Sequence, residues 1–304
     1  MGDTIDKRHN YIAYGLSILS DIELPGFLTC DKPADVSITI GKVPYEFKKL
    51  RRQNMKVLPN ELYLRIKGIK FYIKDGSQIV IENPGRTDYN VIRGCITGIC
   101  MSVIMLQRGF IPIHGSCVVI DEKGIILTGN SGAGKSSLCF AFRQQQYEFL
   151  SDEISVISPD DSGKLLVFPA HPQQKLNRKM LKKMGYELPD VYTSSFDGKV
   201  VINSPQQFRN TPVPLSAIFE LRNGSGAVRS IRATGTEKLK NIINNTIYAN
   251  ILVAMGISAD CFSRYIKVAE KVDYFILERP RRKDSIEELF QHIINYVSRE
   301  HGAI

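Results

Sequence analysis

The run GNSGAGKSS, Gly129–Ser137, constrains the fold of this 304-residue chain more than any other feature. An apolar run, GIILTG, leads directly into it, and a helical pattern, SLCFAFRQQQ, continues from it. A loop in this position needs a strand that is buried in a sheet and a helix that packs against that sheet. The sequence therefore predicts an α/β fold, with a mixed sheet and helices around the loop.

The same run matches the pattern G-x-x-x-x-G-K-[ST] at every constrained position. Its glycines let successive backbone N–H groups turn towards phosphate oxygens, and the start of the following helix adds a favourable dipole. Lys135 can bridge the β- and γ-phosphates of a nucleotide, and the Ser136 hydroxyl can ligate Mg²⁺. We expect a nucleotide-binding loop made of Gly129, Asn130, Ser131, Gly132, Ala133, Gly134, Lys135, Ser136 and Ser137.

Asp152 and Glu153 form an acidic pair after the strand pattern EFLS. In many nucleotide-hydrolysing proteins one acid at such a strand end assists Mg²⁺ binding. Two adjacent acids allow one to hold the metal while the other accepts a proton from an attacking hydroxyl. A turn-facing acidic dipeptide is the alternative interpretation. His114, in IPIHGS, taken by itself reads most simply as a packed core residue.

The period of the hydrophobic pattern divides the chain in two. Residues 11 to about 82 read as short strands, whereas apolar residues recur at helical spacing from Asp88 to about Arg108. Beyond the loop, QKLNRKMLKKMG predicts a short basic helix, and strands and helices then alternate to the C-terminus. We predict a small β-rich N-terminal domain over residues 1–86 and a larger domain that carries the loop over residues 87–304.

Composition limits the cellular location and the kinds of partner that we expect. The net charge of +9 is spread without a long basic block, so it favours solvated surface charge over a nucleic-acid surface. Six cysteines without a C-x-x-C pair indicate a reducing compartment. No secretory signal is evident, and the apolar stretch VIRGCITGICMSVIML is interrupted by Arg93 and short for a membrane span. We expect a cytoplasmic protein with no nucleic-acid or membrane partner.

The order of these features resembles the catalytic domain of HPr kinase/phosphorylase: His114-Gly115, a hairpin, the loop G-x-SG-x-GKS and then a strand ending in Asp152-Glu153. The resemblance is clearest over Ile111–Ser158. It implies a P-loop kinase core with ATP and Mg²⁺ as cofactors. It also implies that Asp152 is the base that activates a substrate serine, that Glu153 is a metal or structural partner, and that His114 and Lys135 act near the transferring phosphate. Glu153 replaces a second Asp, and the ExRG-type signature linked to phosphorolysis is absent from the sequence.

The N-terminal opening, YIAYGLSILSDIELP, resembles HPr-kinase-like proteins of ribosomal peptide pathways. Among these are kinases that phosphorylate the C-terminal serine of lasso-peptide precursors. The resemblance implies a ribosomal precursor peptide as substrate. A free-serine kinase, a bifunctional kinase/phosphorylase and a non-catalytic nucleotide-dependent switch stay open, as do ATP against GTP and assembly into a homo-oligomer. Basic residues that could contact phosphate or a carboxylate are Lys175, Arg178, Arg279, Arg281 and Arg282.

Overall fold

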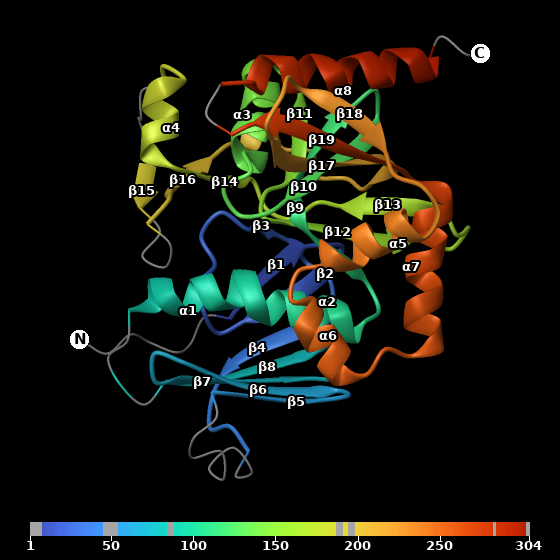
Figure 1. The fold of residues 1–304 in the computed structure, drawn as a ribbon. Coiled ribbons are helices and arrows are strands. Elements are labelled where there is room, and N and C mark those ends of the chain that lie inside the picture. The colour runs from blue at the N-terminus through green and yellow to red at the C-terminus, as the bar shows by residue number, and fades with distance from the viewer. Residues whose placement is uncertain are drawn as a thin grey trace.

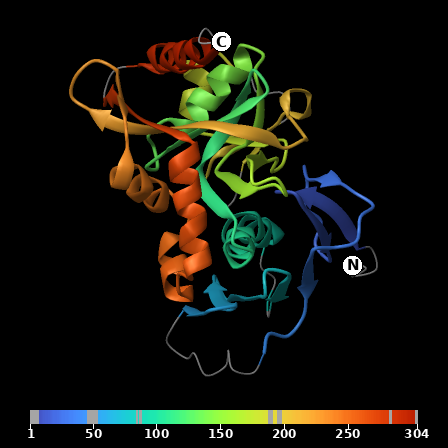
Figure 2. The ribbon, with the colours of Figure 1, turned by 90° about the vertical axis from the view of Figure 1, so that its right-hand side faces the viewer.

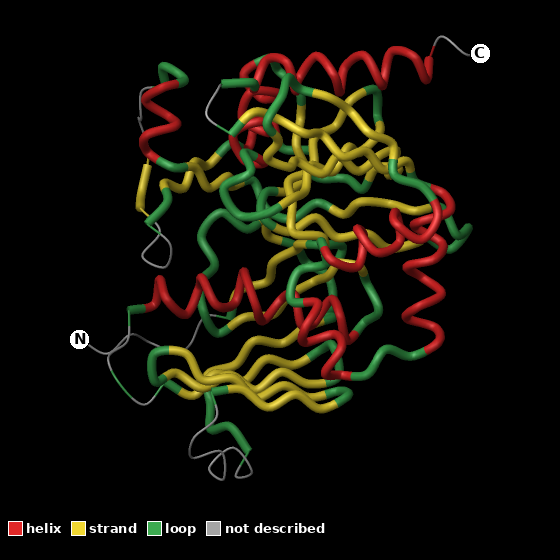
Figure 3. The backbone as a smooth tube through the Cα atoms, viewed as in Figure 1, coloured by secondary structure: helices red, strands yellow, loops and turns green. Residues whose placement is uncertain are grey.

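The computed structural model describes residues 8–44, 54–83, 85, 88–186, 191–193, 198–281 and 284–301, and the statements below refer to these residues. The fold is mixed α/β, which confirms the fold class predicted from the sequence. Figures 1 and 3 show the strands between residues 36 and 82 below one long helix, and the first N-terminal strands and the later strands above it.

The N-terminal residues form an eight-stranded sheet in the order β3-β1-β2-β4-β8-β7-β6-β5. The predicted run of short strands is confirmed, and ELYLRIKGIKFYIKDGSQIVIENP supplies β6, β7 and β8. Strand β4 pairs in parallel with both β2 and β8, and the other pairs are antiparallel. The strands are β1 (His9–Ala13), β2 (Leu16–Ser20), β3 (Leu28–Thr29), β4 (Val36–Ile40), β5 (Met55–Leu58), β6 (Glu61–Ile66), β7 (Ile69–Lys74) and β8 (Gln78–Glu82).

The long helix follows the predicted span. It comprises α1 (Tyr89–Cys95), a π-helical turn η2 (Ile96–Cys100) and α2 (Met101–Gln107), and it is seen nearly end-on at the centre of Figure 2. Asp88 caps its start by accepting the Asn90 N–H at 2.9 Å, and Gly109 follows its end with φ +74°. The helix is 19 residues long and apolar enough to cross a membrane by length and composition, so the expectation that this stretch is too short is wrong. Here 61% of its apolar window is buried inside the protein.

The second sheet carries the glycine-rich loop. Its order is β10-β9-β12-β13-β17-β19-β18, with β11 also paired to β9 and β10 also paired to β17. Because β10 bonds β9 on one edge and β17 on the other, it is an interior strand, as the loop pattern requires. The strands are β9 (Ile111–Ile120), β10 (Lys123–Gly129), β11 (Glu148–Ser151), β12 (Ile154–Pro159), β13 (Leu165–Phe168), β17 (Val213–Gly224), β18 (Arg229–Arg232) and β19 (Asp273–Pro280).

A two-residue turn joins β9 to β10. Ile120 pairs with Lys123, and the residues between them, Asp121 and Glu122, both have positive φ (49° and 59°). This is the geometry of a type I′ turn, whose twist matches that of antiparallel strands. The turn fixes the register in which Thr128, one residue before the loop, lies opposite Gly115.

A third sheet, in the order β14-β16-β15, lies beside the loop. The predicted basic helix is wrong in its first half, because QQKL forms β14 and only RKMLKK is helical. Gln174 and Leu176 are buried and alternate with half-buried Gln173 and Lys175, which is the period of a strand. The elements are β14 (Gln173–Leu176), α4 (Arg178–Lys183), β15 (Val191–Thr193), β16 (Val200–Asn203) and the 3₁₀ turn η3 (Pro205–Gln207).

Five further helices follow the loop, and α6 among them contacts β5 of the N-terminal sheet. They are α3 (Lys135–Gln144), α5 (Gly235–Asn244), α6 (Ala249–Met255), α7 (Ala259–Lys271) and α8 (Ile286–His301). Helices α3 and α8 pack together through a cluster that includes Leu138, Phe142 and Leu289. This packing holds the start of α3, where the loop ends, against the sheet (Figure 1).

One hydrophobic core runs through both groups of strands. Its buried residues include Ile38 and Phe71 of the N-terminal sheet, Ile104 of the long helix, and Ile113 and Val156 of the second sheet. The predicted domain boundary falls between residues 86 and 87, which lie outside the described residues. The division therefore stays a prediction, but the two parts share buried apolar surface.

Candidate functional site

The glycine-rich loop connects β10 to α3 in a conformation that needs its glycines. Gly129 has φ +129°, and a Cβ there would lie 2.4 Å from the Leu221 carbonyl oxygen on the neighbouring strand. Gly134 has φ +106° and caps the start of α3. Side chains at these two positions would displace backbone or strain it, so the loop geometry explains the spacing of the motif.

Lys135 lies inside the loop. It is 7% exposed, and its Nζ donates to the carbonyl oxygens of Gly129 at 2.7 Å and Asn130 at 3.2 Å. Burial lowers the pKa of Lys135 to about 8, although the nearby Asp152 carboxyl acts in the opposite direction. The side chain therefore remains largely protonated at neutral pH and faces the space enclosed by the loop.

Asp152 lies beneath the loop and is only 4% exposed. Its Oδ1 accepts hydrogen bonds from Ser116 Oγ at 2.6 Å and Ser136 Oγ at 3.0 Å, and its Oδ2 accepts one from the Lys175 backbone N–H at 2.9 Å. Burial, and then the neighbouring Glu153 charge, raise the pKa of Asp152 above its ordinary value. The carboxylate is thus directed at Ser136, the first hydroxyl after the loop lysine.

Glu153 points the other way. Its φ is +71°, a left-handed conformation that a non-glycine residue rarely adopts, in the connection between β11 and β12. Its carboxylate pairs with Lys175 Nζ at 2.8 Å and Lys199 Nζ at 3.2 Å. Burial alone would raise its pKa, but the two lysines outweigh that effect and hold the pKa of Glu153 below its ordinary value. Glu153 is therefore ionised at neutral pH.

His114, on β9, lies beside Glu153, which directly precedes the neighbouring strand β12. It pairs with Ile154 in the β9–β12 register, and the Gly115 N–H after it donates to the Glu153 carbonyl at 3.0 Å. Its Nδ1 is buried and has no hydrogen-bond partner among the described residues. Burial, followed by the charge of Lys135, lowers the pKa of His114, so its imidazole is neutral at pH 7. A neutral imidazole offers one nitrogen that can accept a proton.

The loop, His114 and Glu153 open onto one cavity of 460 Å³. Lys175, Lys179, Lys199 and Arg279 also line it, whereas Asp152 does not. A volume of this size is in the range of sites for small molecules and cofactors. The cavity is therefore large enough for a nucleotide phosphate chain, and its charged lining is predominantly positive.

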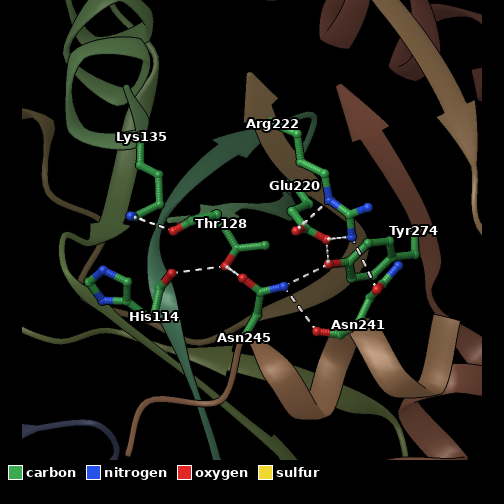
Figure 4. Close-up of polar contacts among 9 residues, drawn as sticks. His114, Thr128, Lys135, Glu220, Arg222, Asn241, Asn245 and Tyr274 are labelled. Carbon is green, nitrogen blue, oxygen red and sulfur yellow. Dashed lines mark hydrogen bonds and ion pairs between the residues drawn. The ribbon is translucent and has the colours of Figure 1, made fainter. Parts of the chain in front are cut away.

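A buried polar network supports the back of the site (Figure 4). Thr128 Oγ1 lies 2.9 Å from the His114 carbonyl oxygen and 3.0 Å from Asn245 Oδ1, and Asn245 Nδ2 donates to Tyr274 Oη at 3.0 Å. Tyr274 Oη in turn donates to Glu220 Oε2 at 2.6 Å, and Arg222 holds the same carboxylate. This network ties β9, β10, β17, β19 and the end of α5 together where His114 and the loop begin.

The structure brings some of the predicted basic residues to the site and leaves others away from it. Lys175 and Arg279 line the cavity, whereas exposed Arg178 and exposed Arg281 do not, and Arg282 lies outside the described residues. The sequence reasoning missed four groups of contacts: Ser116, Lys179, Lys199, and the network of Thr128, Asn241, Asn245, Glu220, Arg222 and Tyr274. Only one local feature of the sequence could have pointed to these residues: a polar residue inside an otherwise apolar strand, as at Thr128 and Glu220.

The residues present fit a magnesium–nucleotide complex. Among the described residues no three His, Cys, Asp or Glu side chains gather into a metal-binding group. Ser136 Oγ and Asp152 Oδ1 are instead adjacent oxygen atoms at the end of the loop, 3.0 Å apart. Magnesium in nucleotide sites is held by one or two protein oxygens together with phosphates and waters. This donor set matches that arrangement.

Comparisons with known proteins give little beyond this geometry. No family model matches the chain, and no curated protein matches it. Among solved structures, it is similar to the Hpr(Ser) kinase/phosphatase from Coxiella burnetii, at 11% identity and a TM-score of 0.33. That match covers 63% of this chain and 93% of the other. A likeness at this TM-score carries no weight for function, which therefore has to be inferred from the site itself.

Proposed function

We propose that this protein is an ATP-dependent kinase with a P-loop core of the HPr kinase type, and that it transfers the γ-phosphate to a serine hydroxyl. The contact that best supports the proposal joins Ser136 Oγ to Asp152 Oδ1 at 3.0 Å. A glycine-rich turn without a ligand would not need a buried carboxylate aimed at the hydroxyl after its lysine. A phosphate-binding loop with Mg²⁺ does need it.

The loop residues would bind the nucleotide. The backbone N–H groups of Gly129–Ser137 would surround the phosphates, and Lys135 would bridge the β- and γ-phosphates. Ser136 and Asp152 would hold Mg²⁺, which neutralises charge on the phosphates when bound. Lys135 has a pKa of about 8 in the free protein, and the negative phosphates would keep it protonated.

We assign the two acids to roles that are the reverse of those implied by the resemblance. Asp152 is buried against Ser136 and belongs to the metal side of the site. Glu153 and His114 line the cavity and belong to the acceptor side. The assignment of Asp152 as base, which the resemblance implies, stays a prediction. The variants Asp152→Asn and Glu153→Gln, described in the Discussion, distinguish the two assignments.

Transfer then proceeds by direct displacement. The serine oxygen forms a bond to the γ-phosphorus, the bond from that phosphorus to the bridging oxygen breaks, and ADP leaves with the electron pair. The hydroxyl proton passes to the imidazole of His114, which lines the cavity and is neutral at pH 7 because burial lowers its pKa. Ionised Glu153, fixed by Lys175 and Lys199, orients the hydroxyl.

The acceptor that we propose is the C-terminal serine of a ribosomal precursor peptide, in the cytoplasm. The resemblance of the N-terminal opening supports it, and so does charge. Lys175, Lys179 and Lys199 outnumber Glu153 on the acceptor side of the cavity, which favours a hydroxyl that carries a carboxylate nearby. Free serine carries the same carboxylate and is the alternative that this charge balance equally favours.

A comparison of acceptors tests the function. The protein with Mg-ATP is given a serine-terminated peptide, the same peptide with a C-terminal amide, or free serine, and phosphorylated product is measured by mass spectrometry. The serine-terminated peptide should be phosphorylated fastest, and the amide should react at least tenfold more slowly because it has lost a charge-assisted contact. Saturable ATP binding without product from any acceptor would instead support a nucleotide-dependent switch. Release of pyrophosphate from phosphopeptide and inorganic phosphate would indicate a bifunctional kinase/phosphorylase.

A further inference from the structure

Arg279 lies on the phosphate-binding loop although it comes from a distant part of the chain. It is near the end of β19, whose parallel pairing with β17, and of β17 with β10, brings it to the edge where the loop begins. Its Nη1 donates to the Ala133 carbonyl oxygen at 3.1 Å. The same nitrogen would lie 2.6 Å from a Cβ on Gly134. The guanidinium therefore contacts the loop at the two residues before Lys135.

The contact with Ala133 engages one nitrogen of the guanidinium, Nη1. Arg279 Nε is buried and has no hydrogen-bond partner among the described residues. The hydrogen bond from Lys183 Nζ at 2.6 Å is the main cause that lowers the pKa of Asp284, and the Arg279 charge only adds to that effect. A buried donor without a partner costs stability unless a ligand satisfies it. Arg279 also lines the same cavity as the loop.

The strand order gives the direction of the nucleotide. Strand β10, which leads into the loop, pairs with β9 on one edge and β17 on the other. Asp152 precedes β12, which pairs with β9, and Arg279 lies on β19, which pairs with β17, so the two residues lie on opposite sides of the loop. The terminal phosphate belongs on the Asp152 side, where Ser136 and the metal are expected. The phosphates nearer the nucleoside then extend towards Arg279, since loop N–H groups of this kind surround the α- and β-phosphates.

We propose that Arg279 binds the α- and β-phosphates of the nucleotide. The inference rests on the proposed function for the identity of the ligand, but it concerns binding rather than transfer. The Nε side of the guanidinium donates to phosphate oxygens, while Nη1 keeps its contact with Ala133. Arg279 would therefore bind the two phosphates that ATP and ADP share, and it would bind neither the γ-phosphate nor the acceptor.

The test measures Mg-ADP and Mg-ATP binding by calorimetry for the parent, Arg279→Met and Arg279→Lys. Arg279→Met should weaken both nucleotides by about 10- to 100-fold, as expected for the loss of charged hydrogen bonds. Arg279→Lys should recover part of this loss, because it keeps the charge but not the planar fork. Arg281→Met is the matched control, since exposed Arg281 lies two residues away and does not line the cavity, and its affinities should equal those of the parent.

Kinetics separate binding from loop structure. If Arg279 binds phosphate, Arg279→Met raises KM for ATP while kcat at saturating ATP stays within a few-fold of the parent. If the residue merely holds the loop through Ala133, kcat falls as well and the inference is overturned. Unchanged ADP affinity in a folded Arg279→Met protein overturns it too. A parent that binds ADP through Arg279 but phosphorylates no acceptor would sink the proposed kinase and leave this inference standing.

Discussion

Asp152 and Glu153 are neighbours in the chain but have opposite environments. The left-handed backbone of Glu153 turns its carboxylate towards two lysines, while Asp152 stays buried beneath Ser136. Burial and the Glu153 charge raise the pKa of one acid, and the lysines lower the pKa of the other. The pair can therefore serve a metal and an acceptor separately.

Conservative substitutions distinguish the two acids. Asp152→Asn should weaken Mg-ATP binding by about 10- to 100-fold, because it removes the charge of one of the two groups that would hold Mg²⁺. Glu153→Gln should leave ATP binding nearly unchanged and slow transfer. The measurements are nucleotide titration and single-turnover transfer for each variant. If Asp152→Asn keeps parental ATP affinity but loses about 10²–10⁴-fold in transfer, Asp152 is the base and our reversal of roles is wrong.

The pH dependence of kcat/KM for ATP should be bell-shaped. On the acid side, the rate should fall through a pKa below 6.5, because burial lowers the pKa of His114 and protonation removes its acceptor nitrogen. On the alkaline side, it should fall above about pH 8, where Lys135 of the free protein loses its charge. Rates from pH 5 to 10 check both limbs. Lys135→Arg keeps its charge above pH 8, so an alkaline decline that persists in this variant would contradict the assignment.

At this scale local motifs predicted the loop, Asp152 and Glu153 as site residues, and the family resemblance predicted His114; these roles stay predictions. The sequence could not identify Asn245, which contacts Thr128 from 117 positions away. Nor could it show which way each acid points, since the direction depends on the positive φ of Glu153. Lys199 was missed as well, and the sequence named Arg279 as a candidate without showing that it reaches the cavity while Arg281 does not.

At the level of elements, the backbone is strained just after the end of α3, and a single substitution should relieve this strain. Gln146 follows the helix with φ +65°, and the Tyr147 N–H donates to the Phe142 carbonyl oxygen at 3.1 Å. Glycine is preferred at this position because it has no Cβ to strain. The exposed Gln146 side chain therefore occupies a position that favours glycine.

Gln146→Gly should stabilise the protein by about 0.5–1 kcal/mol, the balance between relieved left-handed strain and greater unfolded-state entropy. Gln144→Gly is the matched control, because Gln144 is also exposed but is the last residue of α3, where glycine should destabilise by up to about 1 kcal/mol. Thermal melting of both variants gives the answer. A lower melting temperature for Gln146→Gly would show that this helix end is not strained.

Element types with strong periods were predictable, and those set by distant pairing were not. The long helix over residues 88–108 and the hairpin into the loop followed from local pattern and turn residues. Strand β14 did not, because QQKL next to a helical segment has no local strand signal and becomes a strand only by pairing with β16. The parallel pairings of β17, which place Arg279, have the same origin.

For the molecule as a whole, the N-terminal sheet is joined to the site by more than the shared core. The Tyr14 N–H donates to the Pro169 carbonyl oxygen at 2.6 Å, and Phe27 stacks on buried His171 with ring centres 4.9 Å apart. The contacted segment leads into β14, where Lys175 meets both acids. The N-terminal part therefore supports the acceptor side although the phosphate-binding loop lies elsewhere.

We expect the protein to unfold in one transition, because a single core spans both groups of strands. Mg-ATP should raise the temperature of that whole transition. Calorimetry and tyrosine fluorescence should give the same midpoint. Two resolved transitions, with only the later one shifted by nucleotide, would mean that residues 1–86 fold as an independent domain.

The most direct test of the whole account is single-turnover phosphate transfer to a serine-terminated peptide, with the parent and Lys135→Ala compared side by side. Lys135 Nζ donates its hydrogen bonds to the loop carbonyl oxygens of Gly129 and Asn130, so its loss should leave the melting curve close to that of the parent. We predict one phosphate on the terminal serine with the parent and none above background with Lys135→Ala. Equal transfer by a folded Lys135→Ala protein would contradict the phosphate-binding role of the loop and the kinase built on it.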